Sequence, residues 1–91
     1  MGHVNIRMKI MPSGVSTNLE KIKENARKTI EKEGGKGPMF SEEPIAFGLK
    51  AVIVTFIYPE EKEMETLENK LQKIKDVNSI QIIDMRRALW F

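Results

Sequence analysis

Few residues in this sequence of 91 could do covalent chemistry. It has no cysteine, so disulfides, thiolate catalysis and cysteine-ligated zinc are excluded. The single histidine, His3, stands near the chain start, and neither a catalytic triad nor a histidine metal site can be built from it alone. The carboxylate pairs Glu42-Glu43 and Glu60-Glu61 are adjacent in sequence, a pattern typical of solvated charges. The sequence therefore predicts a protein that is not an enzyme and needs no cofactor or metal ion.

A glycine-rich stretch, Gly34-Gly35-Lys36-Gly37, is the nearest approach to a phosphate-binding loop. It lacks the Gly-x-x-x-x-Gly-Lys-Ser/Thr spacing, and it follows a predicted helix rather than a strand. We interpret it as a turn that ends a helix and predict no stable direct binding of a nucleotide.

The composition predicts one folded domain. Hydrophobic residues make up 41% and charged residues 31%, and 91 residues leave no room for a second core. The net charge of +2 is small and the basic residues alternate with glutamates, so DNA is not an expected partner. The longest apolar run, Ala51 to Tyr58, is too short to span a bilayer. The start of the chain lacks a secretory pattern, and we expect a cytoplasmic protein without a membrane partner.

Hydrophobic periodicity predicts the elements that must position any site. Residues 3–11 alternate as a half-buried strand, and a capping box of Thr17 and Glu20 starts a helix that the glycines end. Pro59 suits the first turn of a second helix. The remaining segments are a short strand Met39–Ile45, a strong strand Leu49–Tyr58, an apolar helical stripe through Met64, Leu67, Leu71 and Ile74, a turn at Asp76, Asn78 and Ser79, and a last strand Ile80–Met85.

The order strand, helix, strand, strand, helix, strand predicts an α+β, ferredoxin-like βαββαβ fold. Its four-stranded antiparallel sheet carries both helices on one face, with the first and third strands in the centre. Leu49–Tyr58 is apolar on both of its faces. The face turned away from the helices is then either a partner site or a surface covered by the C-terminal tail or a second copy.

The most distinctive stretch is the turn Pro44-Ile45-Ala46-Phe47-Gly48. Pro44 fixes its own backbone, and Gly48 permits a sharp bend or a close approach. Two interpretations remain open for Ile45 and Phe47, which lie where two strands join. Either the phenylalanine folds back into the core of a hairpin, or a stiff loop presents it to a partner as an anchor.

The tail, Arg86-Arg87-Ala88-Leu89-Trp90-Phe91, places two aromatic residues at the end of the sequence. Exposing both rings to water is costly, since burying one stabilises by about 2 kcal/mol. They either fold back onto the apolar sheet face, which we favour, or enter a pocket of a partner.

Three segments resemble the short archaeal form of the translation elongation factor 1-beta family. They are the run Glu43-Pro44-Ile45-Ala46-Phe47-Gly48-Leu49-Lys50-Ala51, the start from Gly2 to Met11 followed by Pro12, and the ending from Asp76-Val77 to Asp84-Met85-Arg86-Arg87. The likeness covers nearly the whole chain. It implies a single exchange domain over residues 1–91 with the ferredoxin-like fold reached above.

The resemblance also implies a function. Members of the family promote guanine-nucleotide exchange on elongation factor 1-alpha, a GTPase that they bind while disturbing its magnesium and phosphate pocket. The contact residues it implies here are Pro44, Ile45, Phe47, Gly48 and Lys50 around the turn, and Arg86, Arg87, Trp90 and Phe91 at the end. Eukaryotic members have a penultimate lysine where this chain has Trp90, so the role of that lysine is not carried over. The alternative is an RNA-binding or small dimerisation or regulatory module of the same fold.

Overall fold

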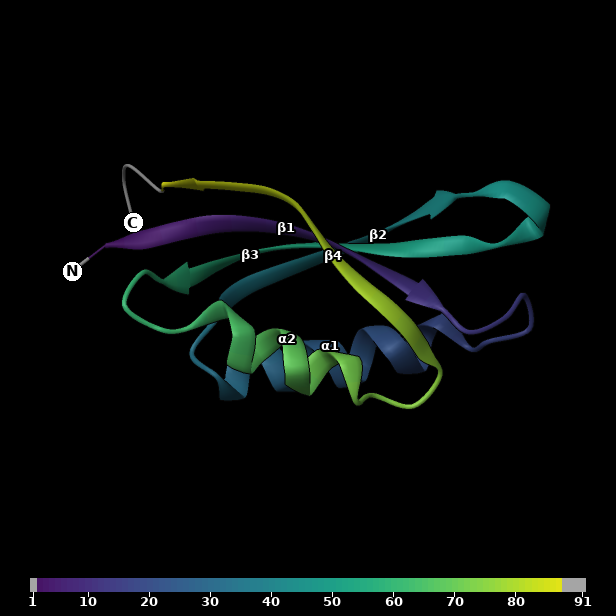
Figure 1. Ribbon diagram of the computed structural model, residues 1–91, viewed down its shortest axis with the longest axis horizontal. Coiled ribbons are helices and arrows are strands. Elements are labelled where there is room, and N and C mark those ends of the chain that lie inside the picture. Colours follow the sequence, from purple (N-terminus) through teal and green to yellow (C-terminus); the bar gives the residue numbers. More distant parts are fainter. Residues whose placement is uncertain (1, 88–91) are drawn as a thin grey trace.

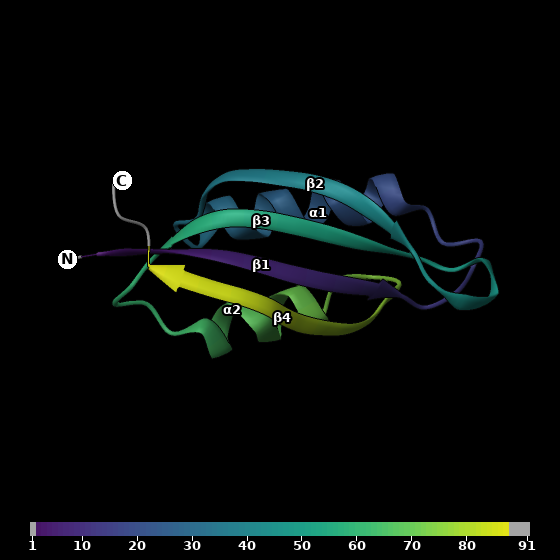
Figure 2. The same ribbon diagram turned by 90° about the horizontal axis from the view of Figure 1, so that it is seen from above.

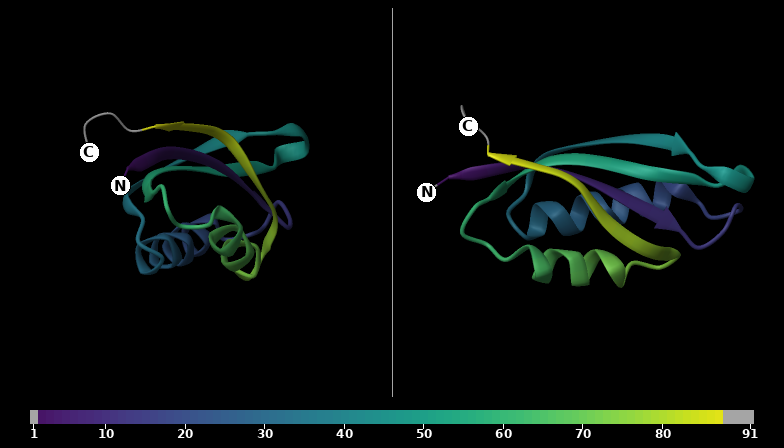
Figure 3. Two further views of the ribbon diagram at one scale, coloured as in Figure 1. Left: turned by 60° about the vertical axis from the view of Figure 1, so that its left-hand side comes forward. Right: turned by 45° about the horizontal axis from the view of Figure 1, so that its top comes forward.

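A computed structural model describes residues 2–87 of the chain. The elements run β1 (His3–Pro12), α1 (Leu19–Lys32), β2 (Lys36–Pro44), the single-turn 3₁₀ helix η1 (Ala46–Gly48), β3 (Lys50–Pro59), α2 (Met64–Gln72) and β4 (Val77–Arg87). The strands form one antiparallel sheet in the order β2-β3-β1-β4, and both helices cover the same face (Figures 1 and 3). The predicted ferredoxin-like fold is therefore confirmed. Neither helix in this part of the chain is long and apolar enough to cross a bilayer.

The core lies between the helices and the covered face of the sheet. Alternation along β1 buries Ile6, Met8 and Ile10 completely, as the sequence pattern predicts. Phe56 and Tyr58 of β3 pack edge to face within this core, with ring centroids 6.0 Å apart. The other core members are Ile22, Ala26 and Ile30 of α1, Val52 and Val54 of β3, and Leu67 and Leu71 of α2.

Helix α1 starts one residue later than the capping box predicts. Asn18 is its N-cap, and the Asn18 Oδ1 accepts hydrogen bonds from the backbone N–H groups of Glu20 at 3.0 Å and Lys21 at 3.4 Å. Thr17 is used differently, because its hydroxyl oxygen accepts a hydrogen bond from the Gly14 N–H at 3.2 Å. The predicted cap at Thr17 is wrong, since the neighbouring asparagine satisfies the first turn instead.

Three other predicted boundaries are also wrong. Pro59 continues β3, where it pairs with His3, and α2 begins only at Met64. Strand β2 begins at Lys36, so the last of the predicted helix-ending glycines, Gly37, lies in a strand at a register shift. Strand β4 spans Val77–Arg87 because β1 pairs with it along nearly its whole length. The predicted turn residues Asn78 and Ser79, and the arginines predicted to belong to a tail, are therefore strand residues.

The face of the sheet away from the helices is not an open apolar patch at β3. Ala51 and Ile53 of β3 point to that face, yet their exposed fractions are only 0% and 3%. An ion pair crosses above them, joining Lys9 Nζ of β1 to Glu43 Oε2 of β2 at 3.2 Å. The sequence showed that β3 is apolar on both faces but not that charged side chains from the flanking strands would cover one of them.

The β2–β3 hairpin reaches beyond the rest of the sheet (Figures 1 and 2). The last paired residues of β1 and β3 are Ile10 and Val52, whereas β2 and β3 stay paired out to Pro44 and Lys50. The molecule is elongated, measuring 42 × 21 × 18 Å along its principal axes. The turn of this hairpin and the loop between β1 and α1 lie at one end, and the beginning of β1 and the end of β4 lie at the other (Figure 2).

Candidate partner-binding site

The turn between β2 and β3 is closed by its own backbone. The Ile45 N–H donates to the Leu49 carbonyl oxygen at 2.7 Å, and the Leu49 N–H donates to the Ala46 carbonyl oxygen at 3.3 Å. Between them Phe47 has φ 62° and ψ 31°, and Gly48 has φ 77°. Two successive residues in the left-handed region reverse the chain within three residues, a conformation that suits glycine and strains phenylalanine.

The left-handed conformation at Phe47 directs its ring into solvent. The residue is 93% exposed, the highest value among the large hydrophobic residues that the structure describes as exposed. Of the two interpretations left open by the sequence, the one in which the ring folds back into the core is therefore wrong. The strained backbone costs the free protein stability, the exposed ring returns almost nothing to it, and such strain clusters at functional sites.

A second exposed apolar residue adjoins the turn. Val15, in the loop between β1 and α1, is 68% exposed, and a methyl group built on Gly48 would lie 3.6 Å from its Cγ1. A hollow of about 250 Å³ opens between the two segments, with Leu19 and Lys50 among its lining residues. Val15 is not among the predicted site residues, although an apolar residue between Gly14 and Ser16 is a signal that could have indicated it.

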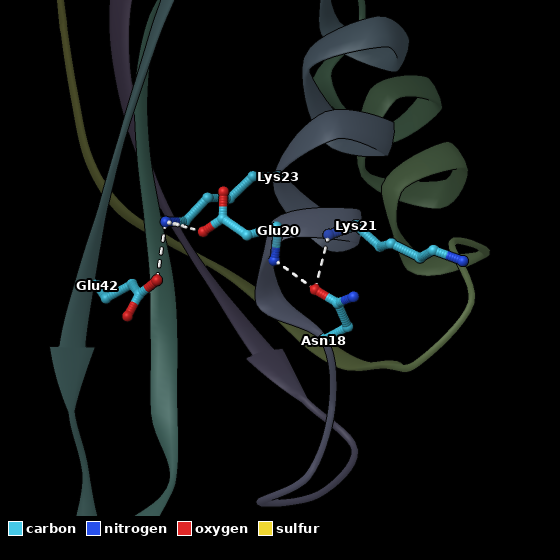
Figure 4. A network of polar contacts seen from close by, with 5 residues as sticks. All are labelled: Asn18, Glu20, Lys21, Lys23 and Glu42. Atoms are coloured by element: carbon cyan, nitrogen blue, oxygen red, sulfur yellow. Dashed lines mark hydrogen bonds and ion pairs between the residues drawn. The ribbon is translucent and has the colours of Figure 1, made fainter.

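Charged side chains of α1 and β2 meet close to the end of β2 (Figure 4). Lys23 Nζ of α1 lies 2.8 Å from Glu42 Oε2 of β2 and 3.1 Å from Glu20 Oε2 of its own helix. The hydrogen bond from Lys23 lowers the pKa of the Glu42 carboxyl, and the positive charge of Lys50 lowers it further. The same hydrogen bond raises the pKa of Lys23. Glu42 is thus held in its charged form beside a turn that exposes an apolar ring.

The predicted arginines lie at the opposite end of the sheet. In β4, Arg86 Nε lies 2.9 Å from Asp84 Oδ2, and Arg87 Nε lies 3.6 Å from Glu60 Oε2 in the connection after β3. Both arginine side chains stay largely exposed. Trp90 and Phe91 fall outside the described residues, so their predicted self-burial and partner contacts stay predictions.

The structure does not bring the two groups of predicted residues together. Arg87 lies level with Tyr58 of β3, because both residues pair with Val4 of β1. Lys50, at the start of β3, lies eight positions before Tyr58. At about 3.3 Å per residue, the turn and the arginines are separated by about 26 Å along the sheet. Residues Pro44 to Lys50 form one compact group, and a partner that contacts both groups must cover most of the length of the domain.

The described residues offer little for chemistry or for RNA bases. They include no group of three histidine, cysteine, aspartate or glutamate residues placed to hold a metal ion. Apart from Tyr58, no residue with a polar or charged side chain among residues 2–87 is buried. An RNA-binding sheet needs exposed aromatic residues, but Phe56 and Tyr58 are each 1% exposed and pack against the helices. Neither aromatic residue of β3 is therefore available for base stacking.

Comparison with known proteins identifies a family for the chain. Residues 5–88 match the model of the EF-1 guanine nucleotide exchange domain. The chain is 41% identical over 88 residues to a protein named Elongation factor 1-beta from Methanosarcina barkeri, covering 96% of this chain and 99% of the relative. A protein of the same name from Methanocaldococcus jannaschii is 38% identical over 90 residues, covering 97% of this chain and 100% of the relative. Another from Staphylothermus marinus is 35% identical over 89 residues, covering 96% of this chain and 98% of the relative.

Proposed function

Since the chain belongs to the EF-1 guanine nucleotide exchange domain family, we propose that it promotes GDP release and GTP loading on elongation factor 1-alpha. The family match and the names of the relatives support a guanine-nucleotide exchange role in translation elongation. In this proposal, residues 1–91 act as one exchange domain in the cytoplasm. The domain binds the GTPase and disturbs its magnesium and phosphate pocket. No bond is made or broken by the chain itself.

The observation that carries this proposal is the exposed ring of Phe47 at the tip of a strained turn. A phenylalanine that is 93% exposed gains almost nothing from the free fold, so its apolar surface is available to a partner. Burying such a ring on binding contributes about 2 kcal/mol, enough to change affinity about thirtyfold. The closed backbone of the turn sets the direction of the ring, and Lys50 adds a positive charge at the start of β3.

A two-ended contact accounts for the separation of the predicted residues. The GTPase spans the roughly 26 Å between the turn and the end of β4, where Arg86 and Arg87 supply positive charge. Trp90 and Phe91 extend this second contact. Because Trp90 stands where eukaryotic members have a lysine, the charge that competes with magnesium comes from an arginine or from Lys50.

Exchange by binding alone is energetically sufficient. A factor that prefers the nucleotide-free GTPase lowers the nucleotide's affinity by the same coupling free energy, because linkage is reciprocal. A coupling of about 4 kcal/mol corresponds to roughly a thousandfold faster release if it appears entirely in the dissociation rate. No catalytic group is needed for that effect.

The proposal is tested by the release of a fluorescent GDP analogue from elongation factor 1-alpha, measured with increasing amounts of the chain. We expect a rate that rises and saturates, and that falls strongly with Phe47→Ala. Met39→Ala is the matched control, because Met39 is another large apolar residue, 73% exposed, on a strand instead of the turn. An unchanged release rate at micromolar wild-type chain would refute the exchange function.

A further inference from the structure

Two consecutive glutamates stand where the β2–β3 hairpin leaves the sheet. Glu42 pairs with Val52, which is the last residue of β3 that pairs with β1. Glu43 pairs with Ala51, and from there to the Pro44–Lys50 pair the hairpin has only two paired strands. An isolated two-stranded hairpin is marginally stable in water, so the direction of this projecting segment depends on what supports its base.

Glu42 is tied to the helix layer. Its carboxylate lies 2.8 Å from Lys23 Nζ of α1, and Lys23 also contacts Glu20 at 3.1 Å (Figure 4). The side chains of Lys23 and Glu42 are only 21% and 31% exposed, whereas those of the within-helix pair of Lys28 and Glu24 are 70% and 54% exposed. The Lys23–Glu42 pair is therefore better shielded from solvent than an ordinary surface pair.

Glu43 is tied to the opposite face of the sheet, because successive residues of a strand point to opposite sides. Its carboxylate lies 3.2 Å from Lys9 Nζ of β1, and the pair crosses over Ala51 and Ile53 of β3. The hairpin is thus held from both sides at the point where the third strand stops pairing. A bend of the hairpin toward the helices or away from them would strain one of the two ion pairs.

We propose that Glu42 and Glu43 are positioning residues that fix the direction of the Phe47 turn, through Lys23 on one face and Lys9 on the other. The effect on exchange rests on the proposed function, whereas the effect of the two ion pairs on the direction of the turn does not. A turn held in one direction loses less conformational freedom when it binds, which favours the complex. Neither glutamate has to touch the partner for this effect.

The experiment measures backbone order and exchange in the same variants. The variants are Glu42→Gln, Glu43→Gln, the charge swap Lys23→Glu with Glu42→Lys, and Glu24→Gln as a matched control within the same helix. The swap also carries Glu20→Gln, because Glu20 contacts Lys23 and would otherwise repel the new glutamate. Nuclear magnetic resonance relaxation of the free domain gives order parameters for residues 45–49, and fluorescent GDP release gives the exchange efficiency. In each glutamine variant of the hairpin we expect these order parameters to fall from about 0.85 toward 0.6. Exchange efficiency should fall about two- to fivefold.

The swap should restore both quantities, and Glu24→Gln should leave both at the wild-type value. Order parameters of residues 45–49 that stay unchanged in both hairpin variants would overturn the inference, whatever happens to exchange. A loss that the charge swap does not restore would also overturn it, because the ion pair would then not be the cause. Absence of exchange by the wild-type chain would refute the proposed function alone, since the order parameters need no GTPase.

Discussion

Replacing Phe47 by asparagine should stabilise the free protein while it damages exchange. Phe47 is held at φ 62°, where a phenylalanine costs about 1–2 kcal/mol and where asparagine is one of the few residues that is tolerated. The ring is 93% exposed, so the fold buries only about a fourteenth of its surface. On a side chain of about 200 Å², losing that burial costs about 0.3 kcal/mol. The variant Phe47→Asn should therefore raise the free energy of unfolding by about 1 kcal/mol.

The same substitution removes the proposed anchor. Losing the burial of one aromatic ring at an interface costs about 2 kcal/mol, so the affinity for elongation factor 1-alpha should fall about thirtyfold. Urea unfolding gives the stability, and fluorescent GDP release at subsaturating chain gives the exchange efficiency. Met39→Asn, at an exposed apolar position outside the turn, is the control for exchange.

Two results would refute this reasoning separately. A stability of Phe47→Asn that is unchanged, or lower by about the 0.3 kcal/mol of lost burial, would show that the left-handed backbone is not strained there. Wild-type exchange efficiency in Phe47→Asn would show that the ring is not an anchor, whatever the stability.

Three further predictions concern the scaffold. Gly35→Ala should destabilise the fold by about 1–3 kcal/mol, measured by urea unfolding, because the added methyl would clash with Ile30 Cγ2 in the core. Asn18→Ala should cost about 1 kcal/mol through loss of the α1 N-cap, while an unchanged midpoint would contradict that assignment. The pKa of Glu42 is lowered by the hydrogen bond from Lys23, so its contribution to stability is complete above the ordinary value of 4.5 and is lost as the pH falls through the lower folded value. As the pH falls through that acid range, the free energy of unfolding should therefore decrease less in Glu42→Gln than in the wild type.

The fold follows from the sequence because its strongest signals are local. The alternation along Val4–Ile10 and the apolar run through Val52 and Phe56 each bury a face, and the observed core contains these residues. Boundaries were harder to predict, because they depend on pairing with a neighbour. Pro59 reads as a helix start in sequence, yet the pairing of β3 with β1 carries the strand through it.

The site was only partly predictable. The stretch from Pro44 to Gly48 stands out by residue type, but nothing local decides whether Phe47 faces the core or solvent. That choice is made by the left-handed backbone of Phe47 and Gly48, which only the closed turn reveals. The ion pair between Lys23 and Glu42 joins residues 19 positions apart, and no spacing rule predicts such a contact.

The most direct test of the account is to locate the contact on the chain itself. Isotope-labelled chain is titrated with nucleotide-free elongation factor 1-alpha, and the loss of amide signal is followed residue by residue. The amides of residues 45–49 and of the end of β4 should be affected first, and Phe47→Ala should weaken the effect. Signal loss confined to the sheet face around Arg7 and Lys9, with the turn unchanged, would contradict it.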